Sequence, residues 1–238
     1  MALGSQPRWT VRSADMQVGV DVGLRNYMLR VYNYMASGLA ITGIVAYVAA
    51  ASGFYQAIQH TPLIWLIILA PLGLVMLMSF GAQRMQASTL QLVFWGYSAL
   101  MGLSLAMVFL VFTQSSIARV FFITAGTFAG MSLYGYTTRR DLSQFGSFLF
   151  MGLIGIIIAS VVNMFIASSA MQFAISVIGV LVFTGLTAYD TQQIKEMYYA
   201  ADGAETTSKK AIMGALRLYL DFINLFMMLL QLMGTRRS

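Results

Sequence analysis

Two long stretches of this sequence carry no formal charge, and they constrain the fold more than any other feature. The first runs from Val31 to Gln83 and holds 53 residues; the second runs from Leu142 to Tyr189 and holds 48. At about 1.5 Å per residue, one helix of either length would far exceed the roughly 30 Å hydrocarbon core of a bilayer. Each stretch must therefore cross an apolar medium and turn back.

Polar residues mark a turn inside each stretch, at Gln59–Pro62 and at Ala167–Gln172. We therefore predict an all-α integral membrane protein with seven transmembrane helices, in which residues 1–30 form a polar cytoplasmic segment and residues 31–238 the transmembrane domain. The continuous hydrophobicity excludes a β-barrel, whose strands alternate polar and apolar residues. The predicted spans lie near 33–54, 62–83, 89–112, 118–137, 143–167, 172–194 and 211–233.

The composition supports a lipid environment. Hydrophobic residues make up 59% of the chain and charged residues only 9%, whereas soluble domains carry about 25% charged residues. The bilayer is therefore the expected partner. The net charge of +6 comes mostly from short polar connections, so we expect no nucleic-acid partner. The chain has no cysteine, which excludes disulfides and thiolate metal sites.

Lysine and arginine predict the orientation, because they gather on the cytoplasmic side of membrane proteins. A cytoplasmic N-terminus puts 11 of the 14 cations inside and leaves Arg119, Arg236 and Arg237 outside. The alternative is a last segment that dips into the membrane and returns, which would bring Arg236 and Arg237 inside. We favour a full span.

Two acids lie in or at the edge of apolar spans, Asp190 and Asp221. Asp190 lies about 18 residues, or roughly 27 Å, from the outer start of its span, and Asp221 lies about 10 residues, or roughly 15 Å, from the inner start of its own. Both therefore fall in the cytoplasmic half, where antiparallel neighbours could meet. Two carboxyl groups that meet away from water share a proton, and its loss leaves two repelling anions. Such a pair is a pH switch, and it could ligate Ca²⁺ transiently.

Each acid also has a purely structural interpretation. Asp221 follows Arg217 by four residues, the spacing of an ordinary helical ion pair, and Asp190 could be an interfacial residue beside Lys195. Arg84, at the inner end of the second span, could reach either aspartate or could extend to lipid headgroups. Arg84 and Arg217 are therefore the candidate partners of the pair.

Polar side chains in the last span recur at steps of three and four. The stripe consists of Arg217, Asp221, Asn224, Met228 and Gln231, of which all but Met228 are polar. Polar groups at membrane depth turn toward the bundle interior, so we expect a central position for this helix and a pore-facing role for Asn224 and Gln231. The small residues Gly126 and Gly130 have GxxxG spacing, which predicts close helix packing.

Several segments together resemble the Bax inhibitor family, its bacterial branch in particular, over about residues 25 to 233. The two strongest are Thr187–Ile194 (TAYDTQQI) and Leu218–Phe226 (LYLDFINLF). Weaker similarity lies in Tyr34–Gly43, Ala70–Gly73 and Met131–Tyr136. The resemblance implies six helices around a central seventh, a bacterial inner-membrane location, and a pH-sensitive calcium leak with Asp190 and Asp221 as its sensor. It also implies an arginine of the second helix that holds the closed state, for which Arg84 is the charged candidate.

Three functions compete at this point. The first is a calcium leak gated by the aspartates, with Ca²⁺ as the transported ion and no cofactor. The second is a membrane protein that regulates a protease or channel, or suppresses cell death, through other membrane proteins and without transport of its own. The third is an intramembrane aspartyl protease. We do not expect an enzyme, because Asp221 lies in Leu-Tyr-Leu-Asp rather than Gly-x-Gly-Asp and no proline follows Pro71.

Overall fold

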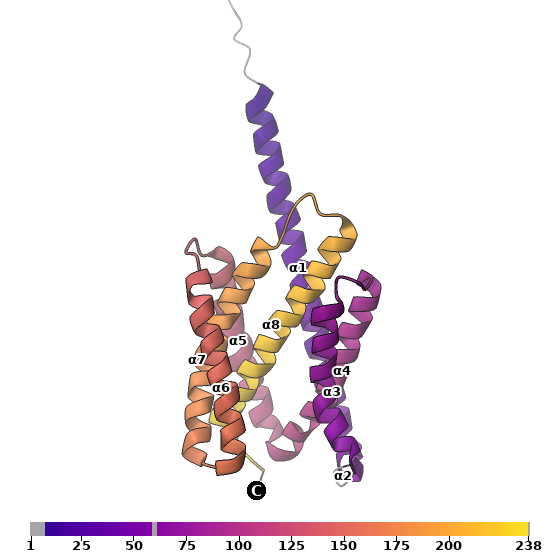
Figure 1. Ribbon diagram of the computed structural model, residues 1–238, viewed down its shortest axis with the longest axis vertical. Helices are drawn as coiled ribbons and strands as arrows, with labels where there is room; N and C mark the ends of the chain where they lie inside the picture. Colours follow the sequence, from indigo (N-terminus) through magenta and orange to yellow (C-terminus); the bar gives the residue numbers. More distant parts are fainter. Residues whose placement is uncertain (1–7, 59–60, 238) are drawn as a thin grey trace, which may run out of the picture.

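The computed structural model describes residues 8–58 and 61–237, and in this part of the chain helices are joined by short turns with no strand beyond one isolated bridge. Seven of the helices are long and apolar enough to cross a membrane, which confirms the predicted all-α membrane fold (Figure 1). The helices are α1 (Arg8–Ala51), α2 (Phe54–Ile58), α3 (Leu63–Gly81), α4 (Ala87–Val111), α5 (Gln114–Thr137), α6 (Ser143–Ile166), α7 (Ser169–Glu196) and α8 (Ala204–Met233).

The last helix, α8, lies at the centre of the bundle and packs against α1, α4, α5 and α7 (Figure 1). In its most apolar stretch 67% of the residues are buried, compared with 11% to 39% in the other six spans. The helix α3 packs chiefly on α4, and α6 on α7, so these two lie on the outside. The structure confirms the expected arrangement of six helices around a central C-terminal helix.

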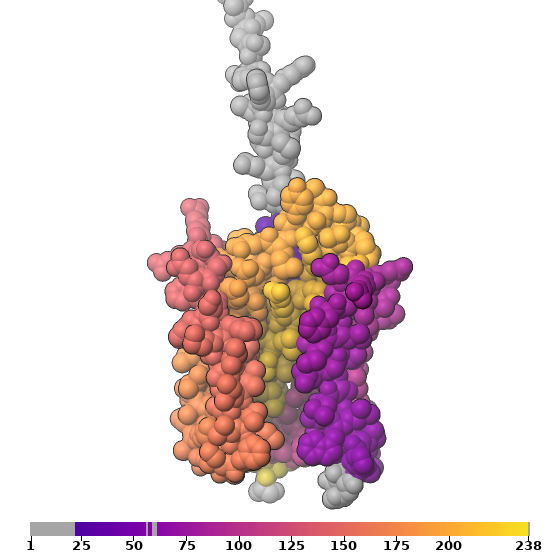
Figure 2. All heavy atoms as spheres, in the orientation of Figure 1, coloured from indigo at the N-terminus to yellow at the C-terminus, as the bar shows by residue number. Residues whose placement is uncertain are grey.

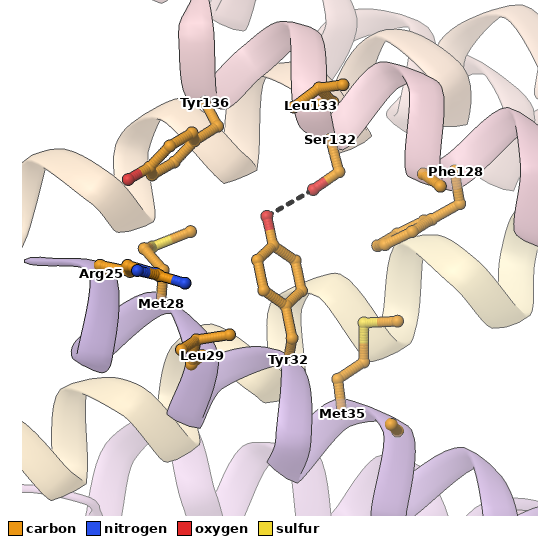
Figure 3. Close-up of a pocket in the computed structure, with 11 residues that line it drawn as sticks. Arg25, Met28, Leu29, Tyr32, Met35, Phe128, Ser132, Leu133 and Tyr136 are labelled. Atoms are coloured by element: carbon orange, nitrogen blue, oxygen red, sulfur yellow. Dashed lines mark hydrogen bonds between the residues drawn. The ribbon is translucent and has the colours of Figure 1, made fainter.

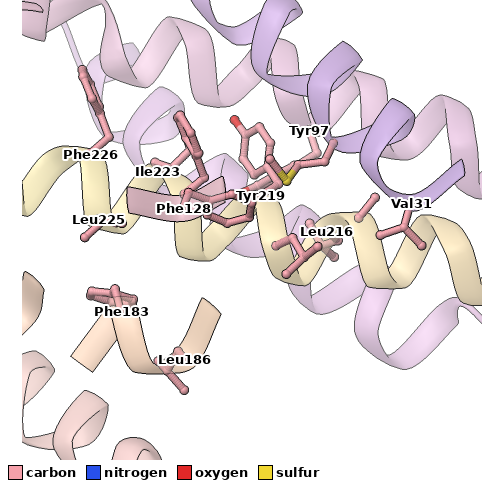
Figure 4. Packing of buried hydrophobic residues seen from close by; sticks show 14 of the residues in the cluster. Val31, Tyr97, Phe128, Phe183, Leu186, Leu216, Tyr219, Ile223, Leu225 and Phe226 are labelled. Carbon is pink, nitrogen blue, oxygen red and sulfur yellow. The ribbon is translucent and has the colours of Figure 1, made fainter. Parts of the chain in front are cut away.

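Large side chains from several helices build the core around α8 (Figure 4). Tyr219 of α8 is fully buried, and its ring packs edge-on against Phe94 and Tyr97 of α4 at centroid separations of 6.1 and 5.4 Å. Its hydroxyl lies 2.6 Å from Oγ1 of Thr42 on α1. A buried tyrosine needs a partner for its polar tip, and this hydrogen bond fixes α8 against α1.

The first helix begins earlier than the sequence predicts. We expected a span near 33–54, but α1 starts at Arg8 and its membrane-crossing part is Val22–Ala51. The cause is a buried stripe at helical spacing that continues past the arginines toward the N-terminus, while Arg25 and Arg30 point to the exposed side of the same helix. The stripe consists of Tyr27, Met28, Val31 and Met35.

Two further boundaries differ from the predicted spans. The helix α8 begins at Ala204, about two turns before the predicted 211, so the polar connection after α7 is short. Between α6 and α7 the turn is confined to Ala167 and Ser168. Ala167 has a φ of 53°, and Oγ of Ser168 accepts a hydrogen bond from the Met171 amide at 3.3 Å, which caps α7.

The GxxxG prediction is wrong for Gly126 and Gly130, because open space surrounds both and neither meets a neighbouring helix. Close packing occurs at other glycines. A Cβ atom at Gly135 of α5 would lie 2.2 Å from the carbonyl oxygen of Ala188 on α7, and one at Gly102 of α4 would lie 2.7 Å from that of Thr42 on α1. These two glycines let helix backbones approach closely in lipid.

The chain ends at the side of the bundle opposite the projecting start of α1 (Figure 1), as expected of a full span rather than a returning segment. Residues after α8 pair with the α4–α5 connection. The Thr113 amide donates to the Thr235 carbonyl at 3.0 Å, and the Arg237 amide donates to the Val111 carbonyl at 2.9 Å. The Thr235 amide donates to Oγ of Ser116 at 2.9 Å.

The glycine contacts yield a stability prediction. The substitution Gly135→Val should destabilise the protein by about 1–3 kcal/mol or more, because its Cβ would press on a backbone atom that cannot move without parting α5 from α7. Thermal unfolding in detergent measures the effect. The matched change Gly130→Val on the same helix should stay within about 0.5 kcal/mol. Equal melting temperatures for the two variants would contradict the assignment.

Candidate functional site

The two predicted aspartates lie on the helices α7 and α8, which pack along each other. Asp221 is 5% exposed, while Asp190 is partly buried. The two carboxyl groups are near enough to act on each other electrostatically. The structure therefore brings together two acids that are 31 positions apart in the sequence.

The contact has a chemical requirement. A carboxylate only accepts hydrogen bonds, so a bond between two carboxyl groups needs a proton on one of them. With both groups ionised, Oδ2 of Asp221 would be a buried acceptor without a donor among the described residues. A proton on one of the two carboxyl groups would supply such a donor.

The nearby polar side chains of Thr187 and Asn224 form hydrogen bonds with the backbone of their own helices. Oγ1 of Thr187 donates to the Phe183 carbonyl at 2.8 Å, and Nδ2 of Asn224 donates to the Leu220 carbonyl at 2.8 Å. Both bonds stay within one helix. Neither bond reaches the acid pair, whose position follows from the packing of α7 on α8.

Arg217 is the cation that acts electrostatically on both aspartates. Its side chain is exposed, and among the described residues none of its nitrogen atoms forms an ion pair within 4.0 Å of Asp190 or Asp221. The simple helical ion pair between Arg217 and Asp221 is therefore not formed. Arg84 lies exposed in the turn between α3 and α4 and is not among the groups that act on the pair.

The side chain of Lys195 binds α5 and does not pair with Asp190. Its Nζ donates to the Tyr136 carbonyl at 2.8 Å and lies 5.6 Å from the centre of the Tyr136 ring. An interfacial pair of Asp190 with Lys195 is thus not seen. His60 lies outside the described residues.

The polar stripe of α8 borders a recess. Figure 2 shows α8 at the floor of a hollow between α6 and α7 on one side and α3 on the other. Arg217 and Gln231 are exposed, and Asn224 and Met228 are partly exposed, whereas most of α8 is buried. The helix is central, as predicted, and its stripe is exposed at Arg217 and Gln231 but buried at Asp221.

A second polar cluster lies toward the C-terminal end of α8. Oε1 of Gln231 accepts hydrogen bonds from Nε2 of Gln172 and, at 3.0 Å, from Oγ of Ser176. Nδ2 of Asn163 donates to Oε1 of Gln172 at 3.2 Å. The sequence analysis identified Gln231 but not its partners on α6 and α7, although Asn163 and Ser176 are polar residues inside predicted apolar spans.

A chain of hydroxyl groups near the pair was also missed. The Tyr32 hydroxyl of α1 lies 2.7 Å from Oγ of Ser132 on α5, which lies 3.0 Å from Oγ1 of Thr191 on α7. Thr191 is the residue directly after Asp190. Hydroxyl side chains in transmembrane helices often satisfy their own backbone, so the sequence could not reveal that these three meet.

The site has few metal ligands. The described residues contain no group of three or more histidine, cysteine, aspartate or glutamate side chains that could hold a metal ion. Calcium takes 6–8 oxygen ligands in a protein site. Asp190 and Asp221 alone supply fewer oxygen ligands than that.

The chain was compared with known proteins. The family described as "Inhibitor of apoptosis-promoting Bax1" matches residues 24–238. An uncharacterized protein of Rickettsia prowazekii is 50% identical over 230 residues, covering 96% of this chain and 98% of its own length. The inner membrane protein YbhL of Escherichia coli is 49% identical over 228 residues, covering 94% and 97%. A protein of Caulobacter vibrioides is 45% identical over 236 residues, covering 94% of each. The chain therefore belongs to the Bax inhibitor family, and it is a multi-pass membrane protein.

Proposed function

We propose that the protein is a pH-sensitive calcium leak whose gate is the pair Asp190 and Asp221. The observation that carries the proposal is the packing of α7 on α8, which brings two acids near each other, with Asp221 buried and Asp190 partly buried. A shared proton ties α7 to α8. When this proton is lost, the hydrogen bond between the two carboxyl groups is replaced by repulsion between two carboxylates. The packing of α7 on α8 then depends on pH.

The size of the repulsion is sufficient for a gate. Two unit charges about 4 Å apart repel by about 4 kcal/mol at an effective dielectric constant of about 20. Helix contacts in lipid are individually weak, about 0.6 kcal/mol for an average interhelical hydrogen bond. Loss of the proton should therefore outweigh several contacts between α7 and α8.

The recess beside α8 supports a route for cations. Asn224 and Gln231 follow Asp221 on α8 by three and ten residues, and their side chains are partly exposed and exposed. Conduction needs sites that bind an ion weakly enough to release it. Ionised aspartates would attract calcium, and the sparse ligand set would let it leave.

We also propose a bacterial inner-membrane location, with the end of the bundle from which α1 projects facing the cytoplasm. The support is the bias of lysine and arginine toward that end and the printed description of the relative YbhL as an inner membrane protein.

Calcium flux into proteoliposomes should rise with increasing pH, as the shared proton is lost. The variants Asp190→Asn and Asp221→Asn should give a low flux that no longer depends on pH, because an asparagine amide can keep the bond without titrating. As a control, Asp141→Asn should behave like the unchanged protein. Hydrogen bonds from Ser143 hold the pKa of Asp141 below its ordinary value, so this carboxylate stays ionised throughout. Absence of flux, or wild-type behaviour of both variants, would overturn the proposal and favour a regulatory membrane protein.

Removal of Arg217 should shift the flux profile. A nearby cation favours ionised carboxylates, so Arg217→Gln should move the half-maximal flux upward by less than about one pH unit, since the arginine is exposed and screened. Arg84→Gln is the matched control and should leave the profile unchanged. The reverse result, a shift with Arg84→Gln alone, would make Arg84 the partner of the pair.

The orientation is testable because the chain has no cysteine. Ser115→Cys lies in the first turn of α5, at the end where the chain terminates, and Ala201→Cys lies in the α7–α8 connection at the other end; both positions are exposed. A membrane-impermeant maleimide applied to spheroplasts should label the first variant, and the second only after permeabilisation. The opposite pattern would invert the proposed orientation.

A further inference from the structure

A cleft of about 570 Å³ lies between α1 and α5 (Figure 3). It exists because α1 packs on α4 and α8 while α5 packs on α7 and α8, so the two helices diverge from each other. The facing residues Ala36 and Ala129 are small and leave the space open. The volume falls within the range of about 300–1,000 Å³ that small-molecule sites occupy.

The wall of the cleft is almost entirely apolar. Met28, Leu29 and Met35 line it from α1, and Phe128 and Leu133 line it from α5. Its polar floor is already satisfied, because the Tyr32 hydroxyl pairs with Oγ of Ser132 across the cleft at 2.7 Å (Figure 3). A ligand here must therefore be apolar along most of its length.

The cleft opens sideways toward the region that lipid occupies. Leu29 is 47% exposed and Leu133 is 63% exposed, and both belong to membrane-crossing helices. A lipid already in the bilayer can enter laterally without passing through water. From Arg25 to Ala36, the cleft follows α1 for about 16 Å, a length that suits an extended acyl chain.

One end of this apolar cleft carries a positive charge. Arg25 lines it and is exposed, at the end of the bundle where the start of α1 projects and where lipid headgroups lie. A guanidinium group matches a phosphate in geometry and charge. We propose that the cleft binds an anionic phospholipid, with one acyl chain between α1 and α5 and its phosphate on Arg25.

The cleft and the acid pair are distinct sites. The lipid proposal does not require that the protein passes calcium, so binding is the measurement that decides it. The two sites are nonetheless linked by the bonds from Tyr32 to Ser132 to Thr191.

Native mass spectrometry of the full chain with added phosphatidylglycerol or phosphatidylethanolamine tests the headgroup. We expect tighter binding of phosphatidylglycerol, and a loss of about 5- to 10-fold in Arg25→Gln, the scale of one charge-assisted contact. Arg25→Lys should restore part of it. Arg30→Gln is the matched control, because Arg30 is exposed on the same helix but does not line the cleft. Equal binding of both lipids, with no effect of Arg25→Gln, would overturn the proposal.

A second variant tests the cavity itself. Ala129→Trp should fill the cleft and abolish the selective binding, whereas Ala40→Trp, at an exposed position of α1 outside the cleft, should leave it unchanged. Both sites face outward, so each variant should retain the melting temperature of the unchanged protein. Phosphatidylglycerol binding that survives Ala129→Trp would place the lipid elsewhere and refute the assignment.

Discussion

The burial of α8 inside the other helices is the constraint on which the rest of the structure depends. An acid in the middle of a membrane span is costly against lipid, and Asp221 avoids that cost because α1, α4, α5 and α7 enclose its helix. In lipid the hydrophobic effect does not drive this enclosure. Close backbone approach at Gly102 and Gly135 supplies contact area, and the bond between Tyr219 and Thr42 orients the central helix.

The interface between α7 and α8 holds polar groups at two depths with an apolar contact between them. The acid pair lies at one level, and the Gln172, Ser176 and Gln231 cluster lies toward the C-terminal end of α8. Between them Met228 fills the notch above Gly179, where even a Cβ atom would lie 2.7 Å from the methionine side chain. A flexible thioether is well suited to fill an irregular gap between helices.

The two outer helices, α3 and α6, each pack mainly on a single neighbouring helix. The helix α3 packs chiefly on α4, and α6 packs chiefly on α7. The recess beside α8 therefore lies between two helices that have few contacts with the rest of the bundle. On another face, the cleft between α1 and α5 is bridged by the Tyr32 and Ser132 hydroxyl groups. Through Thr191, this bridge reaches the residue next to Asp190.

The sequence by itself determined the membrane fold, the number of spans and the acids worth examining, because hydrophobicity and charge act locally and leave a pattern along the chain. The predicted start of the first span was wrong. Arg25 and Arg30 end the charge-free stretch, but they lie on the exposed side of α1 and do not interrupt its buried face with Tyr27 and Val31. The sequence analysis also assigned close packing to Gly126 and Gly130, although spacing alone cannot tell which face of a helix meets a neighbour.

Only the tertiary structure decided which groups meet. The proximity of Asp190 to Asp221 depends on how helices rotate and cross. The same holds for the bond from Lys195 to Tyr136 and for the greater proximity of Arg217 than Arg84 to the pair. Rotation and crossing are set by side-chain packing between segments far apart in the chain. A linear pattern of residues does not contain that information.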